Sequence, residues 1–87
     1  MQVDIHPRAL KHQLTPEQIK AAANDGIEFA LIRDRDASTE PQRWGVIGFD
    51  QAGHRIELVV VRVTGGVLVI HANYLTKGFE REMRDAR

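Results

Sequence analysis

Four polar residues in the second half of the chain have the side chains and the spacing to bind an anion. Guanidinium groups form paired hydrogen bonds with phosphate oxygens, and an imidazole can transfer a proton near neutral pH. The four residues lie in apolar segments that we expect to be neighbouring strands, so one face of a sheet would present them together. They are Arg43, Arg62, His71 and Asn73.

The turns between these segments set the expected register. Gly65-Gly66 is predicted to be a two-residue hairpin loop, because glycine tolerates positive φ at both positions. The segment Gln51 to His54 is predicted to be a four-residue loop in which Gly53 takes the left-handed conformation. This register sets Arg43 directly opposite Arg62. Because like charges opposite one another destabilise a sheet, the pair would need a carboxylate or a bound anion, and a one-residue slip would move Arg43 to the other face.

Alternation of side chains divides the predicted sheet into an apolar core face and a mixed face. We expect helices to cover the core face, which carries Val59, Val61, Val63, Leu68, Ile70, Ala72, Trp44 and Val46. The mixed face carries the polar set together with Ile47, Leu58, Val60 and Val69. Its apolar area is a surface that a partner protein could cover.

The elements that position these residues predict an α+β fold. Asp4 to Gln13 could form a short helix beginning after His6-Pro7, and Thr15-Pro16 with Gln18 is a helix start. Thr76 caps a terminal helix that begins at Lys77. The predicted strands are Ile27 to Arg33, Arg43 to Asp50, Arg55 to Val63 and Val67 to Tyr74, with Asp34 to Gln42 as a loop. The prediction is a small four-stranded antiparallel sheet with two N-terminal helices and one C-terminal helix.

Composition indicates a single domain over residues 1–87 and restricts the chemistry. Cysteine is absent, which excludes disulfides and cysteine-based zinc sites. His6 and His12 are six residues apart and do not stack on a helix, so we expect neither a metal nor a cofactor. Twelve Lys and Arg balance twelve Asp and Glu, so a polyanion site must be local. No apolar run approaches the ~20 residues of a membrane helix, and we expect a cytoplasmic protein.

Short motifs follow one another along most of the chain. They are Lys11-His12, Leu14-Thr15-Pro16-Glu17, Arg43-Trp44 leading to Gly48, Gly53, the run Glu57 to Arg62, Val69-Ile70-His71-Ala72 and Thr76-Lys77. This succession resembles the BrnT-like toxins, small members of the RelE-type ribonuclease fold from bacterial toxin–antitoxin pairs. The resemblance implies a RelE-like fold, cleavage of RNA, and a cognate antitoxin protein as partner.

The implied reaction is metal-independent attack of the RNA 2′-OH on its neighbouring phosphate. The enzyme must take the proton of that hydroxyl, stabilise charge on the phosphate and protonate the leaving 5′ oxygen. His71 or His12 would be the acid or base, and Lys77 or Lys11 would add positive charge. The implied catalytic residues are His12, Arg43, Arg62, His71 and Lys77, and the implied RNA-binding residues are Lys11 and Asn73.

One alternative is a catalytically inactive protein-binding module of the same fold, and another is a small nucleic-acid binder that does not cleave. Asn73, where the family often has arginine, and the neutral net charge favour the protein-binding module, whereas His71 beside Arg62 favours the enzyme. Plainer roles are also open, because His71 could be a half-buried strand histidine. Arg62 could pair with Glu57 or with an acid of the loop segment Asp34 to Asp36. His54 is expected to be an idle turn residue. The oligomeric state is left open.

Overall fold

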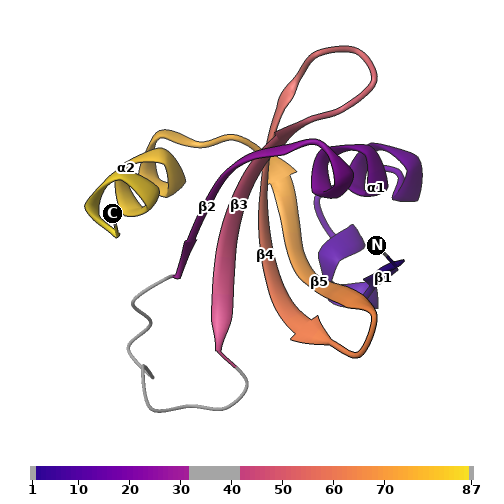
Figure 1. The fold of residues 1–87 in the computed structure, drawn as a ribbon. Helices are drawn as coiled ribbons and strands as arrows, with labels where there is room; N and C mark the ends of the chain where they lie inside the picture. The colour runs from indigo at the N-terminus through magenta and orange to yellow at the C-terminus, as the bar shows by residue number, and fades with distance from the viewer. Residues whose placement is uncertain (1, 32–41, 87) are drawn as a thin grey trace.

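A twisted five-stranded sheet forms the centre of the computed structural model, which describes residues 2–31 and 42–86 (Figure 1). The strands are β1 (Gln2–Ile5), β2 (Gly26–Leu31), β3 (Arg43–Phe49), β4 (Arg55–Val63) and β5 (Gly66–Tyr74). Their order across the sheet is β1-β5-β4-β3-β2. β1 runs parallel to β5, and the other neighbouring pairs are antiparallel. The helices of the described residues are α1 (Pro16–Asn24), α2 (Lys77–Asp85) and a 3₁₀ turn, η1 (Pro7–Leu10).

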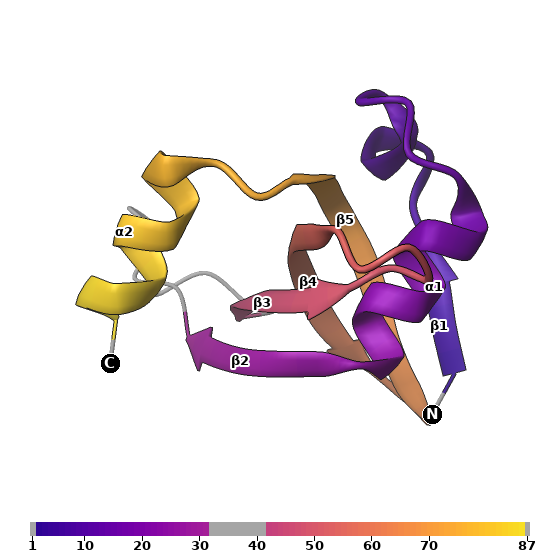
Figure 2. The same cartoon turned by 90° about the horizontal axis from the view of Figure 1, so that it is seen from above.

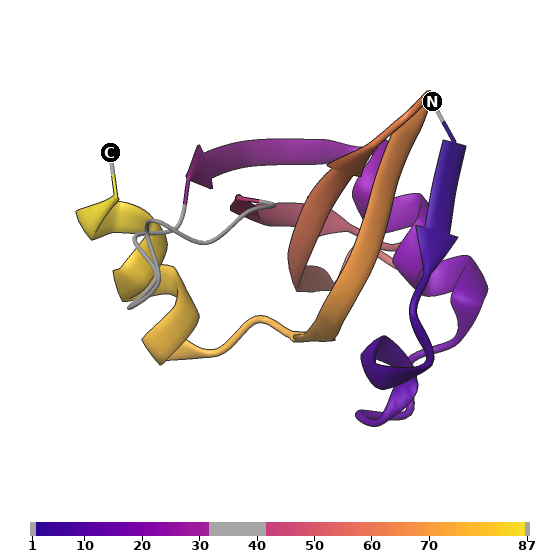
Figure 3. The ribbon, with the colours of Figure 1, turned by 90° about the horizontal axis from the view of Figure 1, so that it is seen from below.

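The predicted four-stranded, wholly antiparallel, RelE-like arrangement with two N-terminal helices is wrong, although the fold is α+β. The N-terminal residues pair with β5 as β1, and only a 3₁₀ turn follows them. Figure 3 shows β1 alongside β5. Val3 and Ile5 alternate with exposed residues and pack against the core, which stabilises a strand rather than a helix. Most of the predicted loop Asp34 to Gln42 lies outside the described residues.

Local signals position the two α-helices as predicted. Thr15 is the N-cap of α1: its side chain accepts from the backbone N–H of Gln18, whose side chain accepts from the backbone N–H of Thr15. Thr76 is the N-cap of α2 and accepts from the backbone N–H of Phe79. No helix among the described residues is long and apolar enough to span a membrane.

The loops of both hairpins differ by one residue position from the predicted ones, which changes the pairing of the strands. The β3–β4 loop is one residue shorter than expected, because Asp50 N–H donates to His54 O and only residues 51–53 lie between them. The β4–β5 loop is Thr64-Gly65, with Gly65 at φ +80°. Gly66 instead begins β5, and it must lack a side chain because an added Cβ would meet the carbonyl oxygen of Gln2 in β1. Because the β3–β4 loop is shorter than predicted, Arg43 lies opposite Val61 and not opposite Arg62.

Two apolar clusters cover opposite faces of the sheet. Val46 packs in the α1 cluster, whereas the next residue, Ile47, packs beneath α2 with Phe79 and Met83. Figure 2 shows the two helices well separated, on different sides of the strands. The predicted core face is therefore partly wrong: Val59 belongs to the α2 side, and the α1 side holds Trp44, Val46, Ile56, Leu58, Val60, Val69 and Ala72. Ile47, Leu58 and Val60, the predicted partner-binding area, are buried within the chain.

Candidate active site

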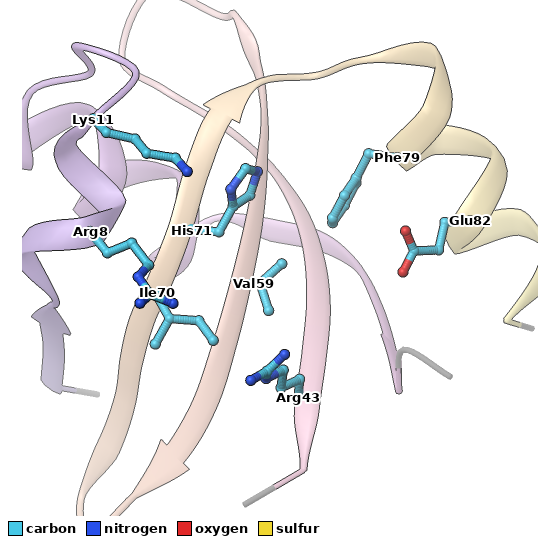
Figure 4. A pocket seen from close by; sticks show the side chains of 8 residues that line it. All are labelled: Arg8, Lys11, Arg43, Val59, Ile70, His71, Phe79 and Glu82. Atoms are coloured by element: carbon cyan, nitrogen blue, oxygen red, sulfur yellow. The ribbon is translucent and has the colours of Figure 1, made fainter. Parts of the chain in front are cut away.

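A pocket of about 350 Å³ lies on the α2 side of the sheet, between η1 and α2 (Figure 4). Three cationic side chains and one carboxylate enter it, from Arg8, Lys11, Arg43 and Glu82. Its remaining lining is Val59, Ile70, His71 and Phe79. We call this the His71 pocket. The lining therefore carries more cationic than anionic side chains, in a chain whose net charge is zero.

A β-bulge turns His71 into this pocket. Val60 pairs with Val69, but Val59 pairs with His71, so Ile70 is an extra residue on β5. A regular ladder would set His71 opposite Leu58, whose side chain is fully buried in the α1 cluster. The bulge instead brings two consecutive residues, Ile70 and His71, to the same pocket. Bulges of this kind commonly re-aim side chains beside functional sites.

The imidazole of His71 is held by the carboxylate of Glu57. Their Nε2 and Oε2 atoms are 2.8 Å apart, and Glu57 is only 4% exposed. The other oxygen of Glu57 accepts from the backbone N–H and the hydroxyl of Thr76, at 2.7 Å each. One buried carboxylate therefore fixes both the His71 ring and the residue that caps α2.

Glu57 is ionised near neutral pH, and this determines which nitrogen of His71 carries a proton. Burial alone would raise the pKa of Glu57, but hydrogen bonds from His71 and Thr76 outweigh it and lower the pKa below its ordinary value. A carboxylate has no proton to donate, so Nε2 of His71 is the donor. In the neutral ring, Nδ1 is then an acceptor that can take a proton from a substrate.

A second imidazole stands next to His71. The rings of His12 and His71 meet edge to face, with centroids 5.5 Å apart and planes at 75°. The ring of Phe79 is nearly parallel to that of His71, with centroids 6.5 Å apart and planes at 22°. His12 is exposed and His71 is about one-third exposed, so two proton-transfer groups lie side by side within reach of solvent.

The N-terminal segment brings Arg8 and Lys11 to the His71 pocket. The backbone N–H of His6 donates to Val69 O at 2.9 Å, which continues the contact between β1 and β5. The His6 ring then caps η1 by accepting from the backbone N–H of Arg8 at 3.1 Å. Ala9, fully buried, fixes the turn against the core. In Figure 4 Lys11 extends from this segment towards the His71 ring.

Arg62 lies on the opposite face from His71, and the predicted pairing of the two is wrong. Arg62 is opposite Val67, and its guanidinium carbon lies 5.1 Å from the centre of the Trp44 ring. Trp44 packs against the α1 cluster. Of the two alternative ion pairs predicted for Arg62, the one with Glu57 is not formed, because Glu57 holds His71 and Thr76 on the other face; the one with an acid of Asp34 to Asp36 lies outside the described residues. Arg62 therefore contributes a cation–π contact away from the pocket.

The remaining predicted site residues are divided between two places. Arg43, Lys11 and His71 line the His71 pocket, and His12 contacts its histidine. Lys77 instead lines a different pocket at the start of α2. Asn73 shares the sheet face of His71 by register, but its side-chain oxygen accepts from the backbone N–H of Tyr74.

No protein-family model matches this chain, and neither the curated proteins nor the solved structures include a significant match. The role of the His71 pocket must therefore follow from its own chemistry.

Sequence reasoning missed Arg8, Glu57 and Glu82 as site residues. Glu57 had a usable signal, since it is the one acidic residue of the Val-rich segment Arg55 to Val63. A carboxylate in a buried strand requires partners, and a histidine on the neighbouring strand is a suitable one. Arg8 had no such signal, because its place depends on the parallel pairing of β1 with β5.

Proposed function

We propose that this chain is a metal-independent endoribonuclease, acting as the toxin component of a bacterial toxin–antitoxin pair. The observation that carries the proposal is a histidine oriented by a buried carboxylate, within one pocket that also receives two arginines and a lysine. The toxin role and the cognate antitoxin as partner rest on the sequence resemblance to BrnT-like toxins.

The proposed step is attack of an RNA 2′-OH on the adjacent phosphate. Nδ1 of His71 takes the hydroxyl proton, and Glu57 stabilises the imidazolium that results. His12, as an imidazolium, gives a proton to the leaving 5′ oxygen. The bond between phosphorus and that oxygen breaks as the bond from the 2′ oxygen forms, which leaves a 2′,3′-cyclic phosphate and a 5′-hydroxyl.

The cationic groups of the pocket supply the charge that this step requires. Negative charge increases on the non-bridging oxygens as the phosphate becomes five-coordinate. Arg8 and Arg43 hold these oxygens with paired hydrogen bonds, and Lys11 adds a point charge beside His71. Glu82, on α2, opposes an anion in the same pocket and therefore restricts how the phosphate group can sit.

The test is incubation of the purified chain with RNA, with its products examined for 2′,3′-cyclic phosphate ends. His71→Ala is expected to slow cleavage about a hundred- to ten-thousandfold, and Arg43→Ala about a hundredfold. Arg62→Ala is the matched control, because it removes the same group from the opposite face and is expected to leave the rate unchanged. DNA lacks the attacking hydroxyl and is expected to remain intact.

Expression of the chain in cells connects the chemistry to the toxin role. If the wild type arrests growth and His71→Ala does not, both the proposed chemistry and the toxin role are supported. Equal losses in Arg43→Ala and Arg62→Ala would contradict the assignment of the site. An absence of cleavage by a folded wild-type chain would replace the enzyme with the protein-binding module.

A further inference from the structure

A second pocket, of about 380 Å³, is lined by residues of the β3–β4 turn and of the segment that leads from β5 into α2. Figure 1 shows these two segments at the same end of the sheet. The residues of its lining that carry the argument are His54, Arg55, Tyr74, Thr76, Lys77 and Glu80. We call it the Tyr74 pocket. It places the exposed ring of Tyr74 near the positive charge of Lys77, and an aromatic ring beside positive charge is the combination that binds single-stranded nucleic acid.

The aromatic surface of this pocket is fixed before any ligand arrives. Gln18 donates one side-chain N–H to the hydroxyl of Tyr74 and another to Asp50, each at 3.1 Å. Asp50 in turn holds Nδ1 of His54 at 2.9 Å, and it accepts from the backbone N–H of His54 at 2.8 Å. His54 therefore has a structural role in the turn, while the prediction that it has no function stays a prediction. The rings of His54 and Tyr74 meet edge to face, with centroids 5.5 Å apart.

Tyr74 nevertheless remains available for stacking. It is 46% exposed, the highest value among the large apolar side chains of the described residues that are exposed. A tyrosine held by hydrogen bonds at its hydroxyl loses little freedom when a base stacks on its ring. A nucleobase is a ligand that would stack on such an exposed, oriented ring.

The charges beside the ring suit a phosphate group. Arg55 contacts Glu80 at 3.4 Å, so these two residues largely neutralise each other. Lys77 is exposed at the first position of α2 and adds a positive charge to the same pocket. A nucleotide would therefore place its base on Tyr74 and its phosphate near Lys77.

Glu57 lines neither pocket but bonds one lining residue of each, His71 of the first and Thr76 of the second. Tyr74 follows His71 by three residues in β5, about 10 Å along a strand, and by register its side chain lies on the opposite face, where Gln18 of α1 bonds its hydroxyl. Single-stranded RNA bound in both pockets would therefore pass around the end of the sheet.

We propose that the Tyr74 pocket binds a nucleotide of single-stranded RNA that flanks the bond cleaved at His71, by base stacking on Tyr74 and phosphate contact with Lys77. This inference rests on the proposed ribonuclease function, since it assigns a subsite to the same substrate. It explains the presence of Lys77 and His54 in a pocket separate from the catalytic histidine.

The test measures binding separately from cleavage. Its ligand is a fluorescein-labelled RNA octanucleotide whose 2′-hydroxyls are methylated, so that it cannot be cleaved, and its readout is fluorescence anisotropy. Tyr74→Leu is expected to weaken binding at least about fivefold, whereas Tyr74→Phe keeps the ring and binds as the wild type does. Lys77→Gln is expected to reduce the slope of log affinity against log salt by about 0.7. Lys20→Gln, an exposed lysine of α1, is the control and leaves that slope unchanged.

A further variant gives the sign of the ligand charge. Glu80→Gln removes a carboxylate and releases Arg55, so RNA is expected to bind more tightly, whereas a basic peptide ligand would bind more weakly. Equal affinity of Tyr74→Leu and Tyr74→Phe, or weaker RNA binding by Glu80→Gln, would overturn the proposal. Cleavage of a minimal dinucleotide reports on the His71 pocket alone. Its failure while the octanucleotide results hold would count against the ribonuclease and not against the Tyr74 pocket.

Discussion

Replacement of Glu57 separates the structural role of this carboxylate from its role in the site. Glu57 accepts three hydrogen bonds, from His71 and from two groups of Thr76. Glu57→Ala removes all three and leaves buried donors without an acceptor, which is expected to cost about 3–5 kcal/mol of the free energy of unfolding. Glu57→Gln keeps an amide oxygen for Thr76 but presents an N–H to His71, and is expected to cost about 2 kcal/mol.

These losses are large for a domain of this size, whose total stability is expected to be about 5–15 kcal/mol. At a denaturant slope of about 1–2 kcal/mol/M, Glu57→Gln lowers the urea midpoint by about 1–2 M at pH 7. Urea unfolding followed by circular dichroism measures it. Glu82→Gln, the same change at an exposed glutamate, is the matched control and is expected to stay within about 0.5 kcal/mol of the wild type.

The stability that Glu57 contributes is expected to fall as the pH is lowered. The folded-state pKa of Glu57 lies below the ordinary value of 4.5. The stabilisation from its ionised form is therefore complete above pH 4.5 and is lost as pH falls through the folded-state pKa. The difference between wild type and Glu57→Gln is expected to narrow below pH 4.5. A difference of the same size at pH 7 and at acid pH, or a cost no greater than that of Glu82→Gln, would refute the role assigned to Glu57.

Three other predictions concern the elements around the two pockets. Gly66→Ala places a Cβ against the backbone of Gln2 and is expected to displace β1, which should speed hydrogen exchange of the β1 amides and weaken RNA cleavage through loss of Arg8. Thr15→Ala removes the cap of α1 and is expected to cost about 1 kcal/mol in urea unfolding. Burial alone would raise the pKa of Asp50, but hydrogen bonds from Gln18 and His54 lower it to about 2; thermal melts should therefore show the wild type losing stability as pH falls from 3.8 towards 2, and Asp50→Asn losing less.

Features with local causes could be predicted from the sequence. The capping box at Thr15 and the cap at Thr76 each depend on residues within one turn of a helix, and both helices begin where predicted. The short strand β1 has no comparable signal. It is four residues long, and its partner strand begins at Gly66, far along the chain. The pairing depends on the close approach that Gly66 allows.

The register of the β4–β5 hairpin was harder to predict, because either of two adjacent glycines could have occupied the turn. Gly65 and Gly66 both suit a tight loop, and the sequence alone does not say which of them must pack against another strand. The β3–β4 loop contains one residue fewer than predicted. As a result, Arg43 pairs with Val61, and the predicted pair Arg43 and Arg62 divides between the two faces.

The bulge at Ile70 positions His71 in the site. Two effects favour it: it keeps the imidazole out of the apolar α1 cluster, and it brings His71 to Glu57. Without the extra residue, the regular ladder would direct His71 into the α1 cluster beside Leu58, where an imidazole would need a buried partner. With it, Val69 and Ala72 both face α1 and are fully buried, while His71 meets Glu57 on the other face. The same irregularity thus keeps the α1 core apolar and gives the chain a carboxylate-oriented histidine among cations. A sheet that needed only stability could achieve the first result with an apolar residue at position 71. The proposed ribonuclease would use the histidine, the buried glutamate and the cationic side chains of the pocket together.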